Sequence, residues 1–413
     1  MIKAQRGTKD IFGEESLTWQ WILDNAKNVF QNACFSEIKT PIFEATELFA
    51  RGVGDSTDIV NKEMYTFCVG GAQKDSTSIT LRPENTAGVV RAFIEHNIVR
   101  QSPPQKFWYF GPMFRYERPQ AGRQRQFHQI GVEMFGIKDA AADAEVIMAA
   151  VNFLKSVGLG NLEVELNSLG CTKCKNDYKN SIKEILKPHL ENLCDDCKMR
   201  YEKNPLRILD CKDENCQKIF ELPEVKEVIM KDYICDECSS HFEQVTNYLD
   251  SLNIKYSRNK LLVRGLDYYN RTVFEIKSSL LGSQSAVCGG GRYDGLVEML
   301  GGQPTPAVGF AMGVERLFTL VEKIQAQKID YFVVSSNTIE AMKLAQKLRQ
   351  ENKVADFDMS ARKFAKQLEK ASKIAKLAVI LGEDEINQGF YSVKNLETGE
   401  QTKISTFEEL LKI

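Results

Sequence analysis

The stretch Leu262–Glu275 gathers charged and phenolic side chains within a short segment. It reads Leu-Val-Arg-Gly-Leu-Asp-Tyr-Tyr-Asn-Arg-Thr-Val-Phe-Glu and contains Arg264, Tyr268 and Tyr269. Charged groups are rarely buried unless they are paired. We therefore expect two strands here that flank a polar pocket for a small charged ligand. A surface hairpin held by a salt bridge is the alternative interpretation.

A basic loop at residues 114–127 is the second candidate. It reads Phe-Arg-Tyr-Glu-Arg-Pro-Gln-Ala-Gly-Arg-Gln-Arg-Gln-Phe, and Glu117 is its only acid. Guanidinium groups offer planar, paired donors and keep their charge, which favours a phosphate clamp. A solvated loop would have the same composition. Arg115 directly follows an expected strand, so it should point from the floor of a sheet.

Acceptor groups also stand where a strand meets a helix. Glu84, Asn85 and Thr86 follow an expected strand and begin an expected helix. This position is typical of a helix N-terminus with an acidic first turn. It equally suits a site for an ammonium group, because an ionised Glu only accepts hydrogen bonds.

One face of another expected strand is polar. Gln129, Gly131 and Glu133 alternate with apolar neighbours and therefore share a face. A face of this kind favours a pocket base with room for a ligand above Gly131. Two further segments are rich in glycine. The glycines of 286–294 would let a substrate or a backbone come close, and those of 309–317, which carries Arg316, would let a nucleotide approach the backbone.

Eight of the eleven cysteines fall between residues 170 and 242. They are Cys171, Cys174, Cys194, Cys197, Cys211, Cys216, Cys235 and Cys238. Three C-x-x-C pairs and one looser pair favour a tetrahedral structural zinc site. A set of reduced packing thiols is the alternative.

The elements that must position these residues fall into three parts. At 413 residues, the chain is too long for one ordinary core. Residues 1–325 mix strand and helix patterns, and a mainly helical, cysteine-rich insertion interrupts them at 170–242. After a short linker, residues 330–413 alternate as β-α-β-α-β, which predicts a three-layer α/β domain.

Individual elements of the first part follow from periodicity. The expected elements are a helix at 16–33 with Ser16 as its N-cap, a strand at 77–81, a helix at 87–96, paired strands at 107–110 and 126–135, and a helix at 143–157.

Composition narrows the class of protein. A net charge of −2 provides no global basic field, so contact with nucleic acid must come from local basic surface. The N-terminus has no apolar signal region, and no apolar run reaches the length of a membrane span. Eleven cysteines without a secretory signal favour a reducing compartment. We therefore expect a cytoplasmic protein without membrane contact.

Taken together, these motifs resemble the histidyl-tRNA synthetase family of class II aminoacyl-tRNA synthetases. Pro41 lies where that family has its first class motif, the loop around Arg115 and Glu117 matches the second, and residues 309–317 match the third. Residues 262–275 and 286–294 match two stretches particular to the histidine enzymes. The resemblance covers essentially the whole chain. It implies an α+β catalytic domain with an antiparallel sheet, a helical insertion, and a C-terminal α/β domain for anticodon recognition.

The resemblance also implies a reaction and its residues. ATP with Mg²⁺ and L-histidine would form histidyl-adenylate, from which histidine passes to tRNA-His. Arg115 and Arg264 would be catalytic and would hold the α-phosphate from opposite sides. The implied ATP-binding residues are Arg115, Glu117 and Arg316. The implied histidine-binding residues are Glu84, Asn85, Thr86, Arg115, Gln129, Glu133, Arg264, Tyr268 and Tyr269, and the family is homodimeric.

Two other functions fit part of the pattern. One is a catalytically inactive paralogue that serves as a regulatory subunit of histidine biosynthesis. Such paralogues have eroded motifs and lack the C-terminal domain, whereas Arg115, Arg264 and Arg316 are all present here. The other is a general tRNA-binding module, which would leave the pocket residues unexplained.

Overall fold

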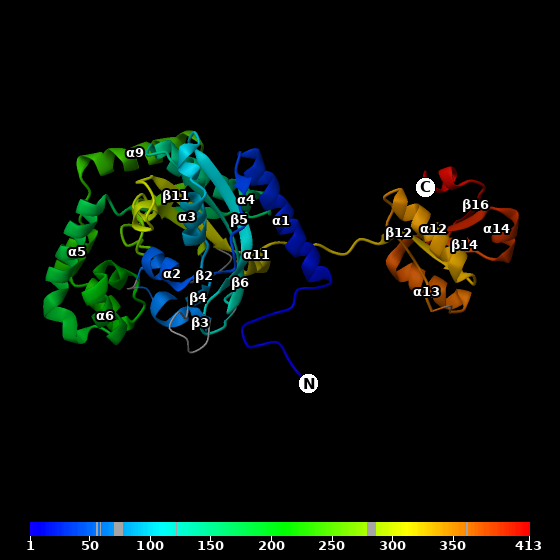
Figure 1. Cartoon of the computed structure of the whole chain (residues 1–413), viewed down its shortest axis with the longest axis horizontal. Coiled ribbons are helices and arrows are strands. Elements are labelled where there is room, and N and C mark those ends of the chain that lie inside the picture. The colour runs from blue at the N-terminus through cyan, green and yellow to red at the C-terminus, as the bar shows by residue number, and fades with distance from the viewer. Residues whose placement is uncertain (55–56, 58, 70–76, 121, 279–285, 361) are drawn as a thin grey trace. The chain divides into compact units, whose positions relative to one another are not determined.

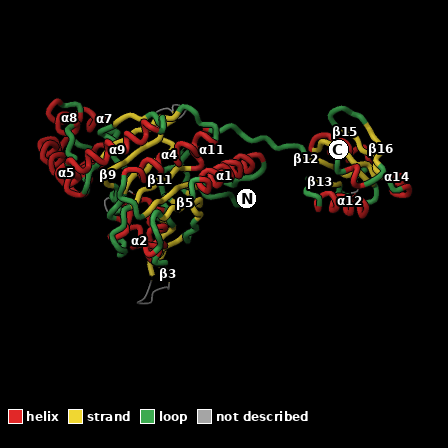
Figure 2. The backbone as a smooth tube through the Cα atoms, turned by 90° about the horizontal axis from the view of Figure 1, so that it is seen from above, coloured by secondary structure: helices red, strands yellow, loops and turns green. Residues whose placement is uncertain are grey.

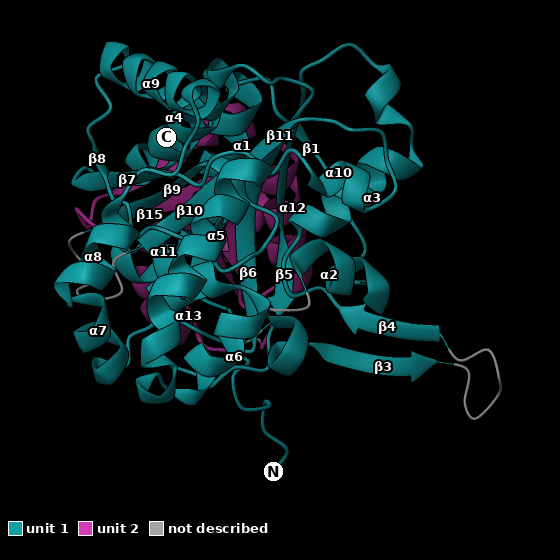
Figure 3. Cartoon of the chain, turned by 90° about the vertical axis from the view of Figure 1, so that its left-hand side faces the viewer, with its two compact units in different colours: residues 1–324 teal, residues 325–413 magenta. Residues whose placement is uncertain are grey.

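The computed structural model describes residues 1–413 except 55–56, 58, 70–76, 121, 279–285 and 361. The described chain forms two compact units, residues 1–324 and residues 325–413 (Figures 1 and 3). Each unit encloses hydrophobic clusters made of its own residues.

An eight-stranded sheet is the centre of unit 1 (Figure 1). Its strand order is β1-β5-β6-β11-β10-β9-β7-β8. The strands are β1 (Ser36–Glu37), β5 (Gln105–Phe114), β6 (Gln126–Phe135), β7 (Leu162–Ser168), β8 (Tyr256–Arg258), β9 (Asn270–Ser278), β10 (Ala286–Arg292) and β11 (Ala307–Gly313). The outer pairs β1–β5 and β7–β8 are parallel, and the inner pairs are antiparallel. The predicted antiparallel sheet is confirmed.

Four helices pack apolar side chains against this sheet. They are α1 (Glu14–Asn32), α4 (Ala140–Ser156), α9 (Asp236–Ser251) and α11 (Val314–Leu320). In α4, Val146, Ile147 and Phe153 are fully buried, as a helix rich in apolar residues requires. Its Asp143 accepts from the Arg292 Nε of β10 at 3.1 Å, and both side chains are buried. This ion pair fixes the helix to one of the central strands.

A smaller sheet, with the strand order β2-β4-β3, supports the start of the next helix. Its strands are β2 (Phe43–Ala45), β3 (Tyr65–Val69) and β4 (Thr77–Leu81). Figure 3 shows β3 and β4 extending away from the rest of unit 1. Helix α2 (Thr46–Val53) packs against β2 and β4. The further helical elements of this part are the π-helical turn η1 (Ile59–Glu63), α3 (Thr86–Glu95), η2 (Ile98–Arg100) and α10 (Leu296–Met299).

The chain between β7 and β8 consists of helices joined by short loops. Its elements are α5 (Thr172–Leu186), η3 (Lys187–Asn192), α6 (Asp195–Lys203), η4 (Pro205–Asp210), α7 (Glu214–Phe220), α8 (Pro223–Met230) and α9. Pro205 and Pro223 each stand in a first helical turn, where a missing N–H costs nothing. Figure 2 shows these helices gathered at one end of unit 1. The predicted helical insertion is confirmed.

Unit 2 is a five-stranded sheet with helices, in the strand order β13-β12-β14-β15-β16. Its strands are β12 (Ile329–Ser335), β13 (Ala355–Phe357), β14 (Ala375–Leu381), β15 (Tyr391–Asn395) and β16 (Gln401–Ile404). Its helices are α12 (Thr338–Gln350), α13 (Phe364–Ile374), α14 (Glu383–Gln388) and α15 (Phe407–Leu410). The predicted β-α-β-α-β order is confirmed, and the antiparallel β15 and β16 extend it.

Two local predictions are wrong. Helix α1 begins at Glu14, and Ser16 lies in its first turn, where its hydroxyl donates to the carbonyl of Gly13 at 2.7 Å. The strand expected at the start of 262–275 is a loop. The carbonyl of Leu262 accepts from the side chain of Asn167 at 3.1 Å. This carbonyl is therefore paired with a side chain and not with the backbone of a neighbouring strand.

Candidate active site

A cavity of about 400 Å³ in unit 1 collects most of the predicted site residues. Its lining comes from segments that are far apart in the sequence. The predicted residues that border it are Glu84, Thr86, Arg115, Glu117, Gln129, Arg264, Tyr268, Tyr269 and Arg316. Asn85 and Glu133 do not border it. Ala121 of the basic loop lies outside the described residues.

Arg115 is held at the point where β5 ends. Its backbone N–H donates to the carbonyl of Arg125 at 2.9 Å, which closes the hairpin between β5 and β6. Its Nε donates to the carbonyl of Pro83 at 2.9 Å, and its guanidinium lies 5.2 Å from the centroid of the Phe127 ring. Among the residues that the structure describes, no acid pairs with Arg115. The side chain is therefore positioned, and its charge remains available to an anion.

Arg264 lies half-buried beside Glu275 of β9, with which it forms an ion pair. Its Nε has no hydrogen-bond partner among the described residues. The space for its guanidinium exists because residue 289 in β10 is glycine, since a Cβ there would overlap the side chain. An Arg in this position would place fixed positive charge in the cavity.

Arg316 approaches from the first turn of α11 (Val314–Leu320). It donates to the carbonyl of Ala286 at the start of β10. Glu117 borders the same part of the cavity and lies 3.6 Å from Arg123 (Oε2 to Nη1). These contacts hold cationic side chains from two separate motifs around one space.

Glu84 fits both of its predicted roles. Its carboxylate accepts from the backbone N–H of Thr86 at 2.7 Å and of Ala87 at 2.9 Å, so it caps helix α3. The same carboxylate borders the cavity. Burial raises the pKa of Glu84 above its ordinary value, and a cationic ligand would oppose that effect.

Glu133 is buried behind the residues that border the cavity. Its carboxylate accepts from the Thr86 hydroxyl at 2.6 Å and from the Tyr293 hydroxyl. Burial raises the pKa of Glu133 to about 8. In the sheet, Gly309 of β11 pairs with Glu133 of β6, and a Cβ at residue 309 would overlap the carboxylate.

Asn85 turns away from the cavity. Its Oδ1 accepts from the Thr40 hydroxyl at 2.6 Å and from Nη1 of Arg82 at 3.2 Å. Arg82 also donates to the carbonyl of Pro112 at 2.8 Å. Asn85 therefore helps to fix the turn that presents Glu84 and Thr86.

The face of β6 that carries Gln129, Gly131 and Glu133 differs from its prediction at Gly131. Gln129 borders the cavity, and its buried Oε1 has no partner among the described residues. A buried acceptor without a partner costs about 1–3 kcal/mol, so a donor on a ligand would be favoured there. Gly131 does not leave room for a ligand, because the ring of Tyr109 on the paired strand β5 fills the space above it.

Sequence reasoning gave no role to Glu275 or Tyr293, which hold Arg264 and Glu133 respectively. Both lie inside motif stretches, at 262–275 and 286–294, and this position is the sequence signal that could have identified them. Their partners are set by the pairing of β9, β10 and β11. The register of the sheet was needed to identify these contacts.

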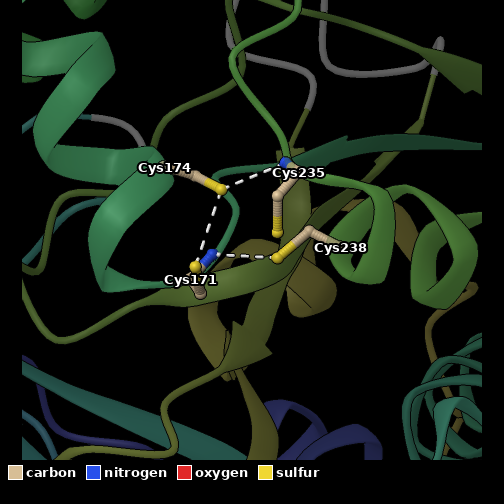
Figure 4. Close-up of side chains that lie close together, drawn as sticks. All are labelled: Cys171, Cys174, Cys235 and Cys238. Carbon is tan, nitrogen blue, oxygen red and sulfur yellow. Dashed lines mark hydrogen bonds between the residues drawn. The ribbon is translucent and has the colours of Figure 1, made fainter.

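The insertion brings its eight cysteines together in two groups of four. One group is Cys171, Cys174, Cys235 and Cys238, and the other is Cys194, Cys197, Cys211 and Cys216. Within each group, all sulfur atoms lie within 4.8 Å of one another, and all eight thiols are free. Each group could hold a metal ion. Figure 4 shows the side chains of the first group turned toward one another.

The cavity combines two kinds of recognition. Several guanidinium groups suit phosphate, whereas Glu84 and the Gln129 carbonyl suit a donor such as an ammonium group. Such an arrangement can hold an anionic and a cationic group side by side and stabilise charge at phosphorus without covalent participation. Among the described residues, we find no helix that is both long and apolar enough to cross a bilayer.

Comparison with known proteins gives full-length matches. The family model for histidyl-tRNA synthetase matches residues 7–317, and that for an anticodon binding domain matches residues 330–413. A histidine–tRNA ligase of Halothermothrix orenii is 48% identical, covering 100% of this chain and 99% of the relative. One of Caldanaerobacter subterraneus subsp. tengcongensis is 47% identical, covering 98% and 97%. The crystal structure of apo S. aureus histidyl-tRNA synthetase has a TM-score of 0.81 and 35% identity, covering 100% of this chain and 99% of that chain.

Proposed function

The chain belongs to the histidyl-tRNA synthetase family and attaches histidine to tRNA-His, and we propose that the cavity of unit 1 is where histidine is activated by ATP. The observation that carries this proposal is the meeting of Arg115, Arg264 and Arg316 with Glu84 and Gln129 in one cavity. Cations for a triphosphate and acceptors for an ammonium group are both needed to join these two substrates.

The reaction has two steps. A carboxylate oxygen of histidine attacks the α-phosphorus of ATP, and the bond from that phosphorus to the oxygen bridging to the β-phosphate breaks. Pyrophosphate leaves, and histidyl-adenylate remains. A hydroxyl of the terminal ribose of tRNA-His then attacks the adenylate's carbonyl carbon, and AMP leaves. Neither step requires a covalent enzyme intermediate, so positioning and cationic stabilisation supply the rate.

Arg115 and Arg264 are assigned to the α-phosphate. Both guanidinium groups keep their charge at any physiological pH, and Glu275 orients Arg264. Charge that develops on the phosphate oxygens during attack would be stabilised by these fixed cations. Arg316 and Glu117 are assigned to ATP, which enters as its magnesium complex, with Arg316 on the outer phosphates.

Histidine would be bound by the opposite kinds of group. Glu84, Thr86 and Gln129 are assigned to its α-amino group, and the unpartnered Gln129 Oε1 supports this role. Tyr269 and Glu133 are assigned to the imidazole. Burial raises the pKa of Tyr269 to about 12, so its hydroxyl stays protonated and can donate.

The supporting residues complete the histidine site. The ring of Tyr268 lies 4.6 Å from that of Tyr269 (centroid to centroid) and lines the pocket. Asn85 acts through the turn that holds Glu84, as a positioning residue.

Histidine-dependent exchange of pyrophosphate into ATP tests this function. The protein should exchange with histidine and not with other amino acids. A regulatory paralogue would bind histidine without exchange. Exchange that is absent, or that prefers another amino acid, would overturn the proposal.

We further propose that the protein is a cytoplasmic homodimer. Support for the dimer comes from large apolar side chains exposed on the small sheet, namely Phe43, Phe67 and Val69, and from the exposed Ile42 directly before β2. The free cysteines support a reducing compartment. Sedimentation should give twice the chain mass of 46.8 kDa, whereas a monomer at micromolar concentration would contradict the dimer.

The cysteine groups of the insertion are proposed to bind structural zinc. Four thiolates at tetrahedral spacing are the ligand set that zinc prefers in structural sites. Elemental analysis of the purified protein tests this directly, and less than about a tenth of an equivalent of zinc per site would contradict it.

A further inference from the structure

We propose that the insertion holds two separate zinc ions. Both ions would stabilise the loop 264–269, which lines the histidine part of the cavity, through contacts on the side of the loop that faces the insertion. Zinc would thereby set the affinity of the enzyme for histidine. The inference rests on the proposed roles of the cavity and of the cysteines, and it adds a connection between them.

The first group has the spacing of a zinc site before any metal is considered. Sγ of Cys171 and Sγ of Cys174 are 3.6 Å apart. Four thiolates bound tetrahedrally to zinc at about 2.3 Å would lie about 3.8 Å from one another. A disulfide would require about 2.05 Å. The sulfur atoms therefore already surround a space of the size that one zinc ion fills.

The second group repeats this arrangement. Sγ of Cys194 and Sγ of Cys211 are 3.7 Å apart. Each group combines two cysteine pairs that are separated in the sequence. The two groups are nested. The group at 194–216 lies inside the segment that the group at 171–238 closes. Two ions per chain follow from this pairing.

Backbone donors are aimed at the sulfur atoms across each group. The N–H of Cys171 points to Sγ of Cys238, and the N–H of Cys235 points to Sγ of Cys174, each at 3.2 Å (Figure 4). In the second group, the N–H of Cys194 points to Sγ of Cys216 at 3.3 Å. Such donors stabilise thiolates, the form that binds metal.

The first group connects directly to the substrate loop. Lys175 follows Cys174 in α5, and its Nζ donates to the carbonyl of Asp267 at 2.7 Å and to that of Tyr269 at 2.8 Å. Glu237, between the cysteines at 235 and 238, accepts from Arg271 at 2.6 Å just beyond the loop. The group thus fixes the end of the loop that carries the tyrosines.

The second group reaches the same loop from another segment. The chain between Cys197 and Cys211 ends α6 and forms η4. From it, Nδ2 of Asn204 donates to Oδ1 of Asp267 at 2.6 Å, and Arg207 donates to the carbonyl of Gly265. The contacts of the two cysteine groups therefore meet at Asp267, and they extend to Tyr269 from the first group and to Gly265 from the second.

The loop depends on these contacts because it is not part of a strand. On its other side, the N–H of Asp267 meets the carbonyl of Val53 at 3.3 Å, while Tyr268 and Tyr269 face the cavity. A short segment without ladder hydrogen bonds has low local stability unless side chains hold it. Loss of the metal should loosen α5 and η4, and with them the position of the tyrosines.

Metal content is the first test. The purified protein should contain two zinc ions per chain. The double variants Cys174→Ser/Cys238→Ser and Cys197→Ser/Cys216→Ser should each retain one ion, and Cys68→Ser, an exposed cysteine outside both groups, should retain two. One ion or none in the unmodified protein, or disulfides within the groups by thiol titration, would overturn the two-site assignment.

The contact variants Lys175→Met and Asn204→Ala test the connection while leaving every cysteine in place. Each should retain two zinc ions, raise the KM for histidine by about 10-fold to 100-fold, leave the KM for ATP nearly unchanged, and speed amide hydrogen exchange in 264–269. Lys173→Met, an exposed neighbour in α5, should change none of these.

The outcomes separate the two proposals. Unchanged KM and unchanged amide exchange in the zinc-loaded contact variants would overturn the connection. Zinc content and amide exchange do not require turnover, so they test it even if the protein fails to activate histidine. That failure would overturn the proposed function alone.

Discussion

At the scale of single residues, neighbouring side chains hold the proposed substrate-binding groups in place. Glu275 holds Arg264, and Thr86 and Tyr293 hold Glu133. Preorganised charge is effective because it does not have to reorient during the reaction. Substituting a site residue and substituting a neighbour that positions it are therefore separate tests.

Replacing Arg264 with His should remove most of the stabilisation of the developing charge. By analogy with other arginines in phosphoryl transfer, pyrophosphate exchange should fall on the order of 10³-fold, while histidine still binds. Exchange kinetics and equilibrium binding of histidine check this. Arg258→His is the matched control, because Arg258 on β8 forms an exposed ion pair with Asp232. Near-normal exchange in the Arg264 variant would remove this residue from the mechanism.

Replacing Glu133 with Gln should change how stability depends on pH. The pKa of Glu133 is raised in the folded protein from 4.5 to about 8. Its neutral form is therefore favoured by folding, and this contribution is complete below pH 4.5 and is lost as the pH rises through about 8. The wild type should lose up to roughly 3 kcal/mol relative to Glu133→Gln between pH 5.5 and pH 8.5. Urea unfolding at both pH values measures this, and an equal difference at both would contradict the raised pKa.

At the scale of elements, the glycines of β10 and β11 make room for side chains from neighbouring segments. Gly289 admits the guanidinium of Arg264, and Gly309 admits the carboxylate of Glu133. The sequence predicts that the glycines of 309–317 let a nucleotide approach the backbone and that those of 286–294 let a substrate or a backbone come close. Gly289 does border the cavity, but the space next to it belongs to an arginine. The strands thus position ionisable side chains in addition to bordering the cavity.

Gly289→Ala should therefore impair activation while Arg264 is still present. The new Cβ would overlap the flexible end of the arginine, so we expect the side chain to move and exchange to fall about 100-fold. Gly295→Ala is the control, because a Cβ there meets nothing within 4 Å. Thermal unfolding should be similar in the two variants. Full exchange activity in Gly289→Ala would show that Arg264 tolerates displacement.

At the scale of the whole molecule, the features linked to histidine activation and to tRNA recognition lie in different units. The cavity and both cysteine groups lie in unit 1, and the match to an anticodon binding domain lies in unit 2. Because each unit has its own core, activation of histidine should not require unit 2. Recognition of tRNA should require both.

A chain shortened to residues 1–324 should keep histidine-dependent pyrophosphate exchange. Its charging of tRNA-His should fall on the order of 100-fold in kcat/KM, which corresponds to about 2.7 kcal/mol of lost binding. Parallel exchange and aminoacylation assays check this, with the full chain as the control. Equal losses in both assays would show that unit 2 supports the catalytic unit itself.

The sequence by itself determined the family, the antiparallel sheet, the helical insertion, and the motifs that border the cavity, because these depend on residue type and spacing along the chain. Only the tertiary structure decided that Asn85 turns to Arg82, that Tyr109 fills the space above Gly131, and how the cysteines pair. The reason is physical. Spacing fixes which face of a strand a side chain occupies, but strand register and helix packing fix which distant side chain it meets.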